Sequence, residues 1–264
     1  MTADPAPLNR FADAQGALEG PAPRGRAVRV HPASGLPAKE VAAAAAEVDW
    51  QAALPERARG QHWRRQQKLK RAVDIALAGV GLVALAPFLM LVALVVMIDS
   101  PGAVLYPWRV VGHRGRCFTG YKFRTMVPGA ERQRADLLHL NEMSGPVFKM
   151  RRDPRVTRVG RLLRKFSLDE LPELWSVLVG DMSLVGPRPL GEDEFIACSR
   201  VQRQKLSVRP GITCLWQVLG RSEIRNFDEW VRLDKEYIRK WGLWLDLKIL
   251  AKTVLVVLRG TGAY

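Results

Sequence analysis

The segment at residues 75–98, IALAGVGLVALAPFLMLVALVVMI, constrains the fold more than any other part of the chain, because it holds no charged residue. As a helix it would measure about 36 Å, enough to cross a bilayer core of about 30 Å. A single transmembrane helix is therefore the simplest interpretation. The proline within the segment and the charges around it favour a different topology.

Pro87 lies in the middle of this segment, where a proline removes a backbone hydrogen bond and kinks a helix. Both flanks are basic, with Arg64, Arg65, Lys68, Lys70 and Arg71 before the segment and Arg109, Arg114, Arg116, Lys122 and Arg124 after it. Because Lys and Arg accumulate on the cytoplasmic side, two basic flanks disfavour ends on opposite sides. We therefore predict a re-entrant, monotopic helix, held by snorkelling Lys and Arg and bracketed by Asp74 and Asp99 near the headgroups.

The chain has 264 residues, a formal net charge of +15 and a pI of about 10.4. The length fits one catalytic-size domain plus extensions. The charge implies an anionic partner, such as nucleic acid, anionic lipid or a phosphorylated substrate. Cys117, Cys198 and Cys214 have no metal-ligand spacing and fit a reducing compartment better than a disulfide framework.

Composition divides the chain into three regions. Residues 1–60 are rich in Ala and Pro, so we expect a disordered tail with one short helix near 39–53. The tail has no continuous apolar stretch of the kind that marks a secretory signal. Residues 61–98 comprise the basic flank and the membrane helix, and residues 99–264 would form the soluble domain.

Local patterns suggest a few elements of the soluble domain. Residues 104–111 and 117–126 are β-branched and aromatic and predict a β-hairpin. Residues 128–148 predict a mobile loop around a short helix. Four arginines recur every third residue and predict a basic stripe on a helix, namely Arg155, Arg158, Arg161 and Arg164.

Residues 237–258, YIRKWGLWLDLKILAKTVLVVL, are amphipathic and carry Trp241 and Trp244. An ordinary core helix and a helix lying in the membrane plane both fit this pattern, and the upstream apolar segment favours the second. The expected fold class is mostly α with a small β-hairpin (α+β), in a monotopic membrane protein.

Two adjacent acids, Asp169 and Glu170, lie in FSLDELPEL directly after residues 149–165, which hold eight Lys or Arg and one Asp. One interpretation is structural, because Ser167 and Glu170 match a helix capping box. The other is chemical, because carboxylates attack phosphorus and bind magnesium together with phosphate oxygens. The bare pattern leaves both open.

Further basic residues near turns suggest phosphate binding. Arg188 lies between two prolines in GPRP, Arg221 ends RPGITCLWQVLGR, and Lys122 and Arg124 are two apart on one predicted strand. Each alone is more simply explained as a solvated surface charge. Their joint occurrence with Gly and Pro turns favours a site.

The motifs KRAVDIALAG, YKFRTM, DPRVTRVGRLLRKFSLDELPELWSVLVGDMSLVGPRP and RPGITCLWQVLGR occur in this order. From about residue 68 to its end the chain resembles the bacterial sugar transferases, the monotopic polyprenol-phosphate phosphoglycosyl transferases, in their short form. The resemblance implies that residues 99–264 are a cytoplasmic catalytic domain at the bacterial inner membrane. Two differences are YPWRVVG, where the family often has glutamine, and Cys214, where glycine is common.

The resemblance also implies a reaction. A UDP-sugar, with galactose or glucose favoured, gives sugar-1-phosphate to undecaprenyl phosphate, and UMP leaves; this initiates exopolysaccharide, capsule or O-antigen synthesis. Asp169 would be the nucleophile, and Glu170 would assist at Mg²⁺ or on the acceptor phosphate, with both acids as candidate metal ligands. Candidate phosphate or nucleotide contacts are Lys122, Arg124, Arg164, Arg188, Gln217 and Arg221. Pro87 matches the family's helix-breaking proline.

Two other classes of function remain as alternatives. A membrane-tethered nucleic-acid binder would explain the charge, but residues 149–165 lack the interleaved aromatic residues that stack on bases, so we expect no nucleic-acid partner. A non-catalytic scaffold of glycan assembly would use the tail or the basic face to recruit partners.

Overall fold

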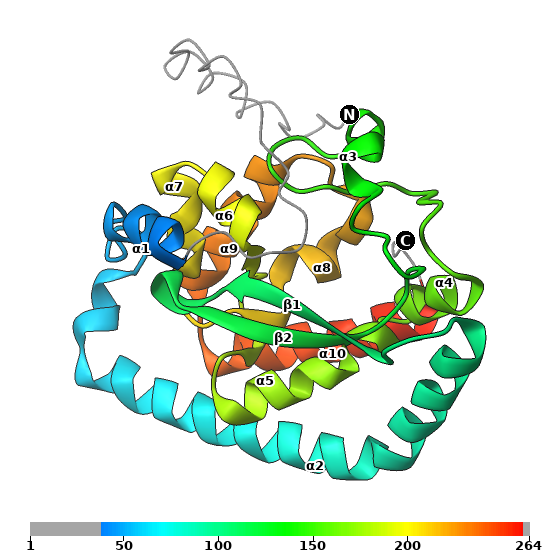
Figure 1. The fold of residues 1–264 in the computed structure, drawn as a ribbon. Coiled ribbons are helices and arrows are strands. Elements are labelled where there is room, and N and C mark those ends of the chain that lie inside the picture. The colour runs from blue at the N-terminus through cyan, green and yellow to red at the C-terminus, as the bar shows by residue number, and fades with distance from the viewer. Residues whose placement is uncertain (1–37, 261–264) are drawn as a thin grey trace, which may run out of the picture.

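The computed structural model describes residues 38–260, and Figure 1 shows their arrangement. The α-helices are α1 (Ala38–Ala46), α2 (Gln61–Asp99), α3 (Arg134–Leu137), α4 (Arg158–Lys165), α5 (Leu174–Val179), α6 (Glu192–Ala197), α7 (Arg200–Arg203), α8 (Leu215–Leu219), α9 (Phe227–Lys240) and α10 (Leu243–Arg259). The strands are β1 (Leu105–Val111), β2 (Cys117–Phe123), β3 (Ser183–Val185), β4 (Leu190–Gly191) and β5 (Gly211–Thr213). Short 3₁₀ helices are η1 (Glu56–Arg59), η2 (His113–Gly115), η3 (Leu138–Leu140), η4 (Leu168–Glu173), η5 (Gln204–Ser207) and η6 (Arg221–Glu223).

The expected hairpin is present. Strands β1 and β2 pair antiparallel from Leu105 opposite Phe123 to Val111 opposite Cys117. Strand β4 pairs with the other edge of β1, which makes a three-stranded sheet. A second, two-stranded sheet of β3 and β5 is parallel and was not expected from the sequence. The fold is therefore mostly helical around two small sheets.

The N-terminal region differs from the expected tail. Residues 1–37 lie outside the described residues, but α1 packs on the domain, and Val41 is fully buried in the same core cluster as Val111 and Phe195. The short helix expected near 39–53 is thus present. Its packing was not expected: the apolar face of α1 is part of the core, so residues 38–46 belong to the folded domain.

Helix α2 continues through Pro87 and is long and apolar enough, by length and composition, to cross a membrane. Many of its apolar side chains are exposed, among them Val80, Val83 and Met90. Figure 1 shows α2 running along one side of the molecule, with its C-terminal part turning back towards the hairpin. Both halves touch the domain, because Ala78 packs on Val177 of α5 and a second cluster comprises Val92, Val96, Phe123 and Leu163.

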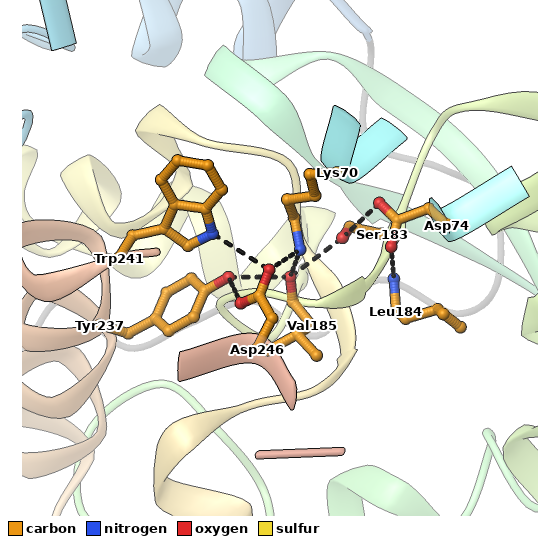
Figure 2. Close-up of polar contacts among 8 residues, drawn as sticks. All are labelled: Lys70, Asp74, Ser183, Leu184, Val185, Tyr237, Trp241 and Asp246. Atoms are coloured by element: carbon orange, nitrogen blue, oxygen red, sulfur yellow. Dashed lines mark hydrogen bonds and ion pairs between the residues drawn. The ribbon is translucent and has the colours of Figure 1, made fainter. Parts of the chain in front are cut away.

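The base of α2 is fixed by a buried polar cluster, shown in Figure 2. Lys70 Nζ donates to Asp246 Oδ2 at 2.6 Å and to the Val185 carbonyl at 3.1 Å. Tyr237 and Trp241 also donate to Asp246, at 2.7 and 3.1 Å. This cluster joins α2 to β3, to α9 and to α10.

Asp74 belongs to the same region of the structure. Its carboxylate accepts hydrogen bonds from the Ser183 hydroxyl, at 2.8 Å, and from the Leu184 N–H. The Asp74 carboxylate therefore faces the protein interior and not the lipid headgroups. Its charge is used inside the domain, to hold α2 against β3.

The C-terminal pattern forms two helices, because α9 ends at Lys240 and α10 begins at Leu243. Trp241 lies between them and is buried, in edge-on contact with Trp63. An interfacial position is therefore wrong for Trp241. Trp244 is 68% exposed and remains a candidate for membrane contact.

The predicted basic stripe is only partly present. Helix α4 begins at Arg158, so Arg155 lies outside it and is buried in an ion pair with Asp153, with Nη2 and Oδ2 2.6 Å apart. Arg158 and Arg161 are exposed, whereas Arg164 is half-buried. The arginines of this segment therefore have different environments.

Candidate active site

A cavity of about 960 Å³ opens between the hairpin, η4 and the segments around α3 and α8. The polar site residues predicted from the sequence all line it, namely Lys122, Arg124, Arg164, Asp169, Glu170, Arg188, Gln217 and Arg221. They come from β2 and the residue after it, α4, η4, the loop after β3, α8 and η6. Pro87 is in α2 and does not line this cavity.

The capping-box interpretation of FSLDELPEL is wrong. Ser167 has a positive φ of 51° and makes no side-chain capping bond, and η4 is a 3₁₀ helix interrupted by Pro172. The Ser167 hydroxyl instead accepts a hydrogen bond from the Arg221 guanidinium. The left-handed residue costs backbone energy and ends α4 abruptly, so the two acids that follow turn towards the cavity.

Glu170 is the anion at the centre of the cations. Lys122 Nζ lies 2.8 Å from Glu170 Oε1, and Arg188 Nη1 lies 3.5 Å from the same oxygen. Burial opposes ionisation, but the charges of Lys122 and Arg188 outweigh it and lower the pKa of Glu170 to about 2. Glu170 is therefore ionised throughout the physiological range.

Asp169 has the opposite character. Burial and the neighbouring charge of Glu170 raise the pKa of Asp169 to about 6, against the attraction of Lys122 and Arg164. Arg164 is held in place by a 2.9 Å hydrogen bond from its Nε to Thr125 Oγ1. Two adjacent carboxylates thus have very different proton affinities, a separation typical of groups with different catalytic tasks.

Lys122 and Arg124 have separate functions in the structure. Lys122 lies over the Trp108 ring, 4.4 Å from its centroid, and contacts the carboxylates of η4. Arg124 donates to the Ser100 carbonyl just after α2. Arg124 therefore links the cavity wall to the C-terminal end of α2, in addition to lining the cavity.

Gln217 and Arg221 close the cavity on the side of α8. The Gln217 Oε1 atom is buried and has no hydrogen-bond partner within residues 38–260. Arg221 adopts a positive φ of 49° at the start of η6, which directs its guanidinium to Ser167. Its pKa is lowered by burial, against the attraction of Glu170 and Asp169.

Two functional candidates were missed by the sequence reasoning. Glu173 is buried, with Oε1 3.3 Å from Lys122 Nζ, and burial together with Glu170 raises its pKa to about 7. Lys149 lines the cavity, which Glu173 does not, and the sequence analysis only counted it among the basic residues of 149–165. Glu173 could have been found from its position three residues after Glu170. No local pattern distinguished Lys149 from the other basic residues around it.

The carboxylates fit a metal held largely by its substrate. No group of three or more His, Cys, Asp or Glu side chains suited to a metal ion occurs in the described part of the chain. Mg²⁺ is commonly bound by one or two carboxylates together with phosphate oxygens and water. Asp169 and Glu170, adjacent and facing a cavity rich in cations, match that incomplete donor set.

Known proteins resemble this chain over most of its length. The family model described as bacterial sugar transferase matches residues 65–260. The chain is 42% identical over 205 residues to "Undecaprenyl-phosphate galactose phosphotransferase" of Salmonella typhimurium, covering 76% of this chain and 43% of that protein. It is 38% identical over 199 residues to "Exopolysaccharide production protein ExoY" of Rhizobium meliloti, covering 74% and 88%. It is 40% identical over 206 residues to "UDP-glucose:undecaprenyl-phosphate glucose-1-phosphate transferase" of Caulobacter vibrioides, covering 74% and 72%. The chain thus spans less than half of the Salmonella protein.

Proposed function

Because the chain belongs to the bacterial sugar transferase family, we propose that it transfers sugar-1-phosphate from a UDP-sugar to undecaprenyl phosphate and releases UMP. The names of two relatives combine undecaprenyl phosphate with galactose or glucose, and a third names exopolysaccharide production. We propose a hexose donor and a role in initiating glycan synthesis.

One observation carries this proposal: Asp169 and Glu170 lie together in a cavity lined by cations from distant parts of the chain. In the first step an Asp169 carboxylate oxygen attacks the phosphorus that bears the sugar. The bond from that phosphorus to the UMP oxygen breaks, and its electron pair leaves with UMP. The product is an acyl phosphate between Asp169 and the phosphosugar.

In the second step an anionic oxygen of undecaprenyl phosphate attacks the same phosphorus. The bond to Asp169 breaks and the carboxylate is restored. Neither step needs a proton, because the attacking and leaving oxygens are both anions. Exchanging one diphosphate for another is nearly neutral in energy, so catalysis depends on positioning and on charge stabilisation.

The cations around the dyad would supply that stabilisation. Lys122 and Arg164 flank Asp169 and would neutralise the phosphate that is attacked. Arg188 and Arg221 face Glu170 and are candidates for the remaining phosphate oxygens. When bound, Mg²⁺ would neutralise the diphosphate further, held by Asp169 and Glu170. Glu170 stays ionised, so it is also suited to orient the metal and the diphosphate.

The membrane arrangement belongs to the same proposal. Lys70, near the start of α2, is bonded to Asp246, and Ser100, just after its end, is bonded to Arg124 of the same domain. A helix whose two ends contact one soluble domain supports a re-entrant path bent at Pro87. We also propose that α10 contacts the interface through Trp244 and that the domain lies on the cytoplasmic face of the inner membrane.

The deciding experiment is UMP release by purified protein in nanodiscs, with undecaprenyl phosphate, Mg²⁺ and a panel of UDP-sugars. We expect release with one hexose donor, abolished by Asp169→Asn and retained by the control Asp181→Asn. Aspartate 181 is outside the cavity. A phosphosugar adduct on Asp169, detected by mass spectrometry without acceptor, would support the covalent step. Folded, membrane-bound protein that releases no UMP with any donor would favour the scaffold alternative.

A further inference from the structure

Lys149 is held rigidly at the edge of the cavity. The Asn141 Oδ1 atom accepts hydrogen bonds from the N–H groups of Met143, at 3.1 Å, and Lys149, at 2.8 Å. The Asn141 side-chain amide donates to the Val147 carbonyl, and the Glu142 N–H donates to the Lys149 carbonyl at 2.8 Å. The backbone of Lys149 is therefore held at its N–H by the Asn141 side chain and at its carbonyl by the Glu142 N–H.

The Lys149 side chain is also guided. Its Nζ lies 5.3 Å from the centroid of the Trp230 ring. Trp230 stacks on Trp216 at 3.9 Å and donates from Nε1 to the Ile224 carbonyl at 3.0 Å. This rigid aromatic pair limits the rotamers of a long cation, so less entropy is lost when Lys149 binds an anion.

Lys149 lines the cavity together with both acids and several other cations. Asp169 interacts chiefly with Lys122 and Arg164, and Glu170 with Lys122, Arg188 and Arg221. Lys149 is repelled by Arg188 and Arg221 and attracted by Glu170 and Glu142. Burial, followed by Arg188 and Arg221, lowers its pKa to about 7. Lys149, Arg188 and Arg221 all line the cavity, and Arg188 Nη1 lies 3.5 Å from Glu170 Oε1.

We infer that Lys149, together with Arg188 and Arg221, binds the phosphate of the departing nucleotide, an inference that rests on the proposed transferase activity. The phosphate that Asp169 attacks would lie between Lys122 and Arg164. The second phosphate of the same diphosphate would then be left to the other cations that line the cavity, Lys149, Arg188 and Arg221. This phosphate gains a negative charge as the phosphorus–oxygen bond breaks and UMP leaves. Lys149 would stabilise that charge and bind UMP afterwards.

The experiment compares Lys149→Met and Lys149→Gln with the charge-conserving Lys149→Arg. Arg152→Met is the matched control, because Arg152 is exposed on the same basic segment and does not line the cavity. Each protein is tested in nanodiscs for the KM and kcat of UMP release, for UMP affinity by calorimetry, and for transfer from a preformed adduct to undecaprenyl phosphate in a single turnover.

Loss of a hydrogen bond to a charged group predicts a rise of about 10-fold to 100-fold in donor KM and in the Kd of UMP for Lys149→Met and Lys149→Gln. Lys149→Arg should recover most of that loss, and Arg152→Met should resemble the wild type. The single-turnover transfer to lipid should stay within about twofold of the wild type, because UMP is absent from that step. Asn141→Ala, which leaves the charge but releases the backbone, should shift the same constants in the same direction.

Unchanged UMP affinity in a folded Lys149→Met or Lys149→Gln protein would overturn the inference. If the wild-type protein still released UMP in the same assay, the proposed function would stand. Slowed lipid transfer with normal UMP affinity would also overturn it, since it would place Lys149 at the acceptor. Failure of the wild type to release UMP from any donor would overturn the proposed function and the inference together.

Discussion

Lys70 and Asp246, 176 residues apart, form a buried ion pair with Nζ and Oδ2 2.6 Å apart. The pair joins the first turns of the long apolar helix to α10. Lys70 also donates to the Val185 carbonyl, three residues before Arg188 of the cavity. One contact therefore connects the membrane helix, the C-terminal helix and the strand that leads into the candidate active site.

Breaking this pair should destabilise the protein strongly. Lys70→Met would leave the Asp246 carboxylate buried without its counter-charge, at a cost of about 3–5 kcal/mol. In an Asp246→Asn background the same substitution should cost much less, because no charge is left unpaired. Thermal unfolding in detergent, followed by tryptophan fluorescence, measures the stability of Lys70→Met, Asp246→Asn and the double variant.

An exposed ion pair provides the comparison. Arg200 and Glu47 lie 3.1 Å apart with side chains 68% and 51% exposed. Arg200→Met should change the free energy of unfolding by less than about 1 kcal/mol. Equal losses for Lys70→Met and Arg200→Met would contradict the proposed importance of the buried pair.

Glu173 should give the stability a recognisable pH dependence. Its pKa is about 7 in the folded protein, raised by burial, and about 4.3 in an unfolded chain. Between these values the folded state holds a proton that the unfolded state has lost, so this group makes stability fall as pH rises. The full effect is on the order of 3 kcal/mol and is complete above about pH 7.

Glu173→Gln removes this ionisation and keeps the shape of the side chain. Relative to the wild type, the variant should therefore gain stability between pH 5 and pH 8, measured by denaturant unfolding. Glu236→Gln is a suitable control, because contacts with Lys240 lower the pKa of Glu236 and its titration ends below that range. A constant difference between Glu173→Gln and the wild type across pH 5–8 would refute the prediction.

Gly160 should not tolerate a side chain. A Cβ at this position would lie 2.1 Å from the Thr125 carbonyl oxygen, so helix α4 would have to move away from the hairpin. Arg164 lies on α4 and bonds Thr125, so the displacement should also affect the dyad. Gly160→Ala is expected to cost about 1–3 kcal/mol of stability and to reduce UMP release.

Gly242 provides the control for Gly160. A Cβ at Gly242 would meet no atom within 4 Å, and its φ of −171° is accessible to any residue. Gly242→Ala should have nearly wild-type stability and activity. If Gly160→Ala were equally mild, the close contact of α4 with Thr125 would have to relax without cost, and the packing described here would be incorrect.

The re-entrant path can be tested with single cysteines. His62, at the start of α2, and Ala103, just beyond its end, are both exposed, and Val83 between them is 78% exposed. In a Cys117→Ser background, cysteines at 62 and 103 should react with an impermeant maleimide in inverted vesicles and not in intact cells. A cysteine at 83 should react in neither. Labelling of 62 and 103 from opposite sides would establish a spanning helix.

Several features of the protein were predictable from local sequence. The apolar segment, the hairpin and the helical content depend on neighbouring residues, so periodicity and composition were sufficient to place them. The pattern of two adjacent acids beside a basic stretch was also visible, but it left a structural and a chemical interpretation open, and only the family resemblance implied a catalytic role for Asp169 and Glu170. Their companions were identified through family motifs, whose order in the chain is preserved.

Other features depended on contacts between distant residues. The capping box was a plausible local reading of Ser167 and Glu170, but Lys122 and Arg188 compete for Glu170 and Arg221 takes the Ser167 hydroxyl. Trp241 looked interfacial in an amphipathic pattern, but the break between α9 and α10 buries it. In each case a tertiary contact outweighed a weak local preference.

By itself the sequence determined that the chain carries a long apolar helix, a small hairpin and two adjacent acids beside a basic stretch. Only the tertiary structure decided which cations surround that pair, how its two pKa values separate, that Lys149 lines the same cavity, and that Glu173 lies against Lys122. The physical reason is that propensity and periodicity act over a few residues. Electrostatic environments are set by charges that lie far apart in the chain and meet only when folding has excluded water between them.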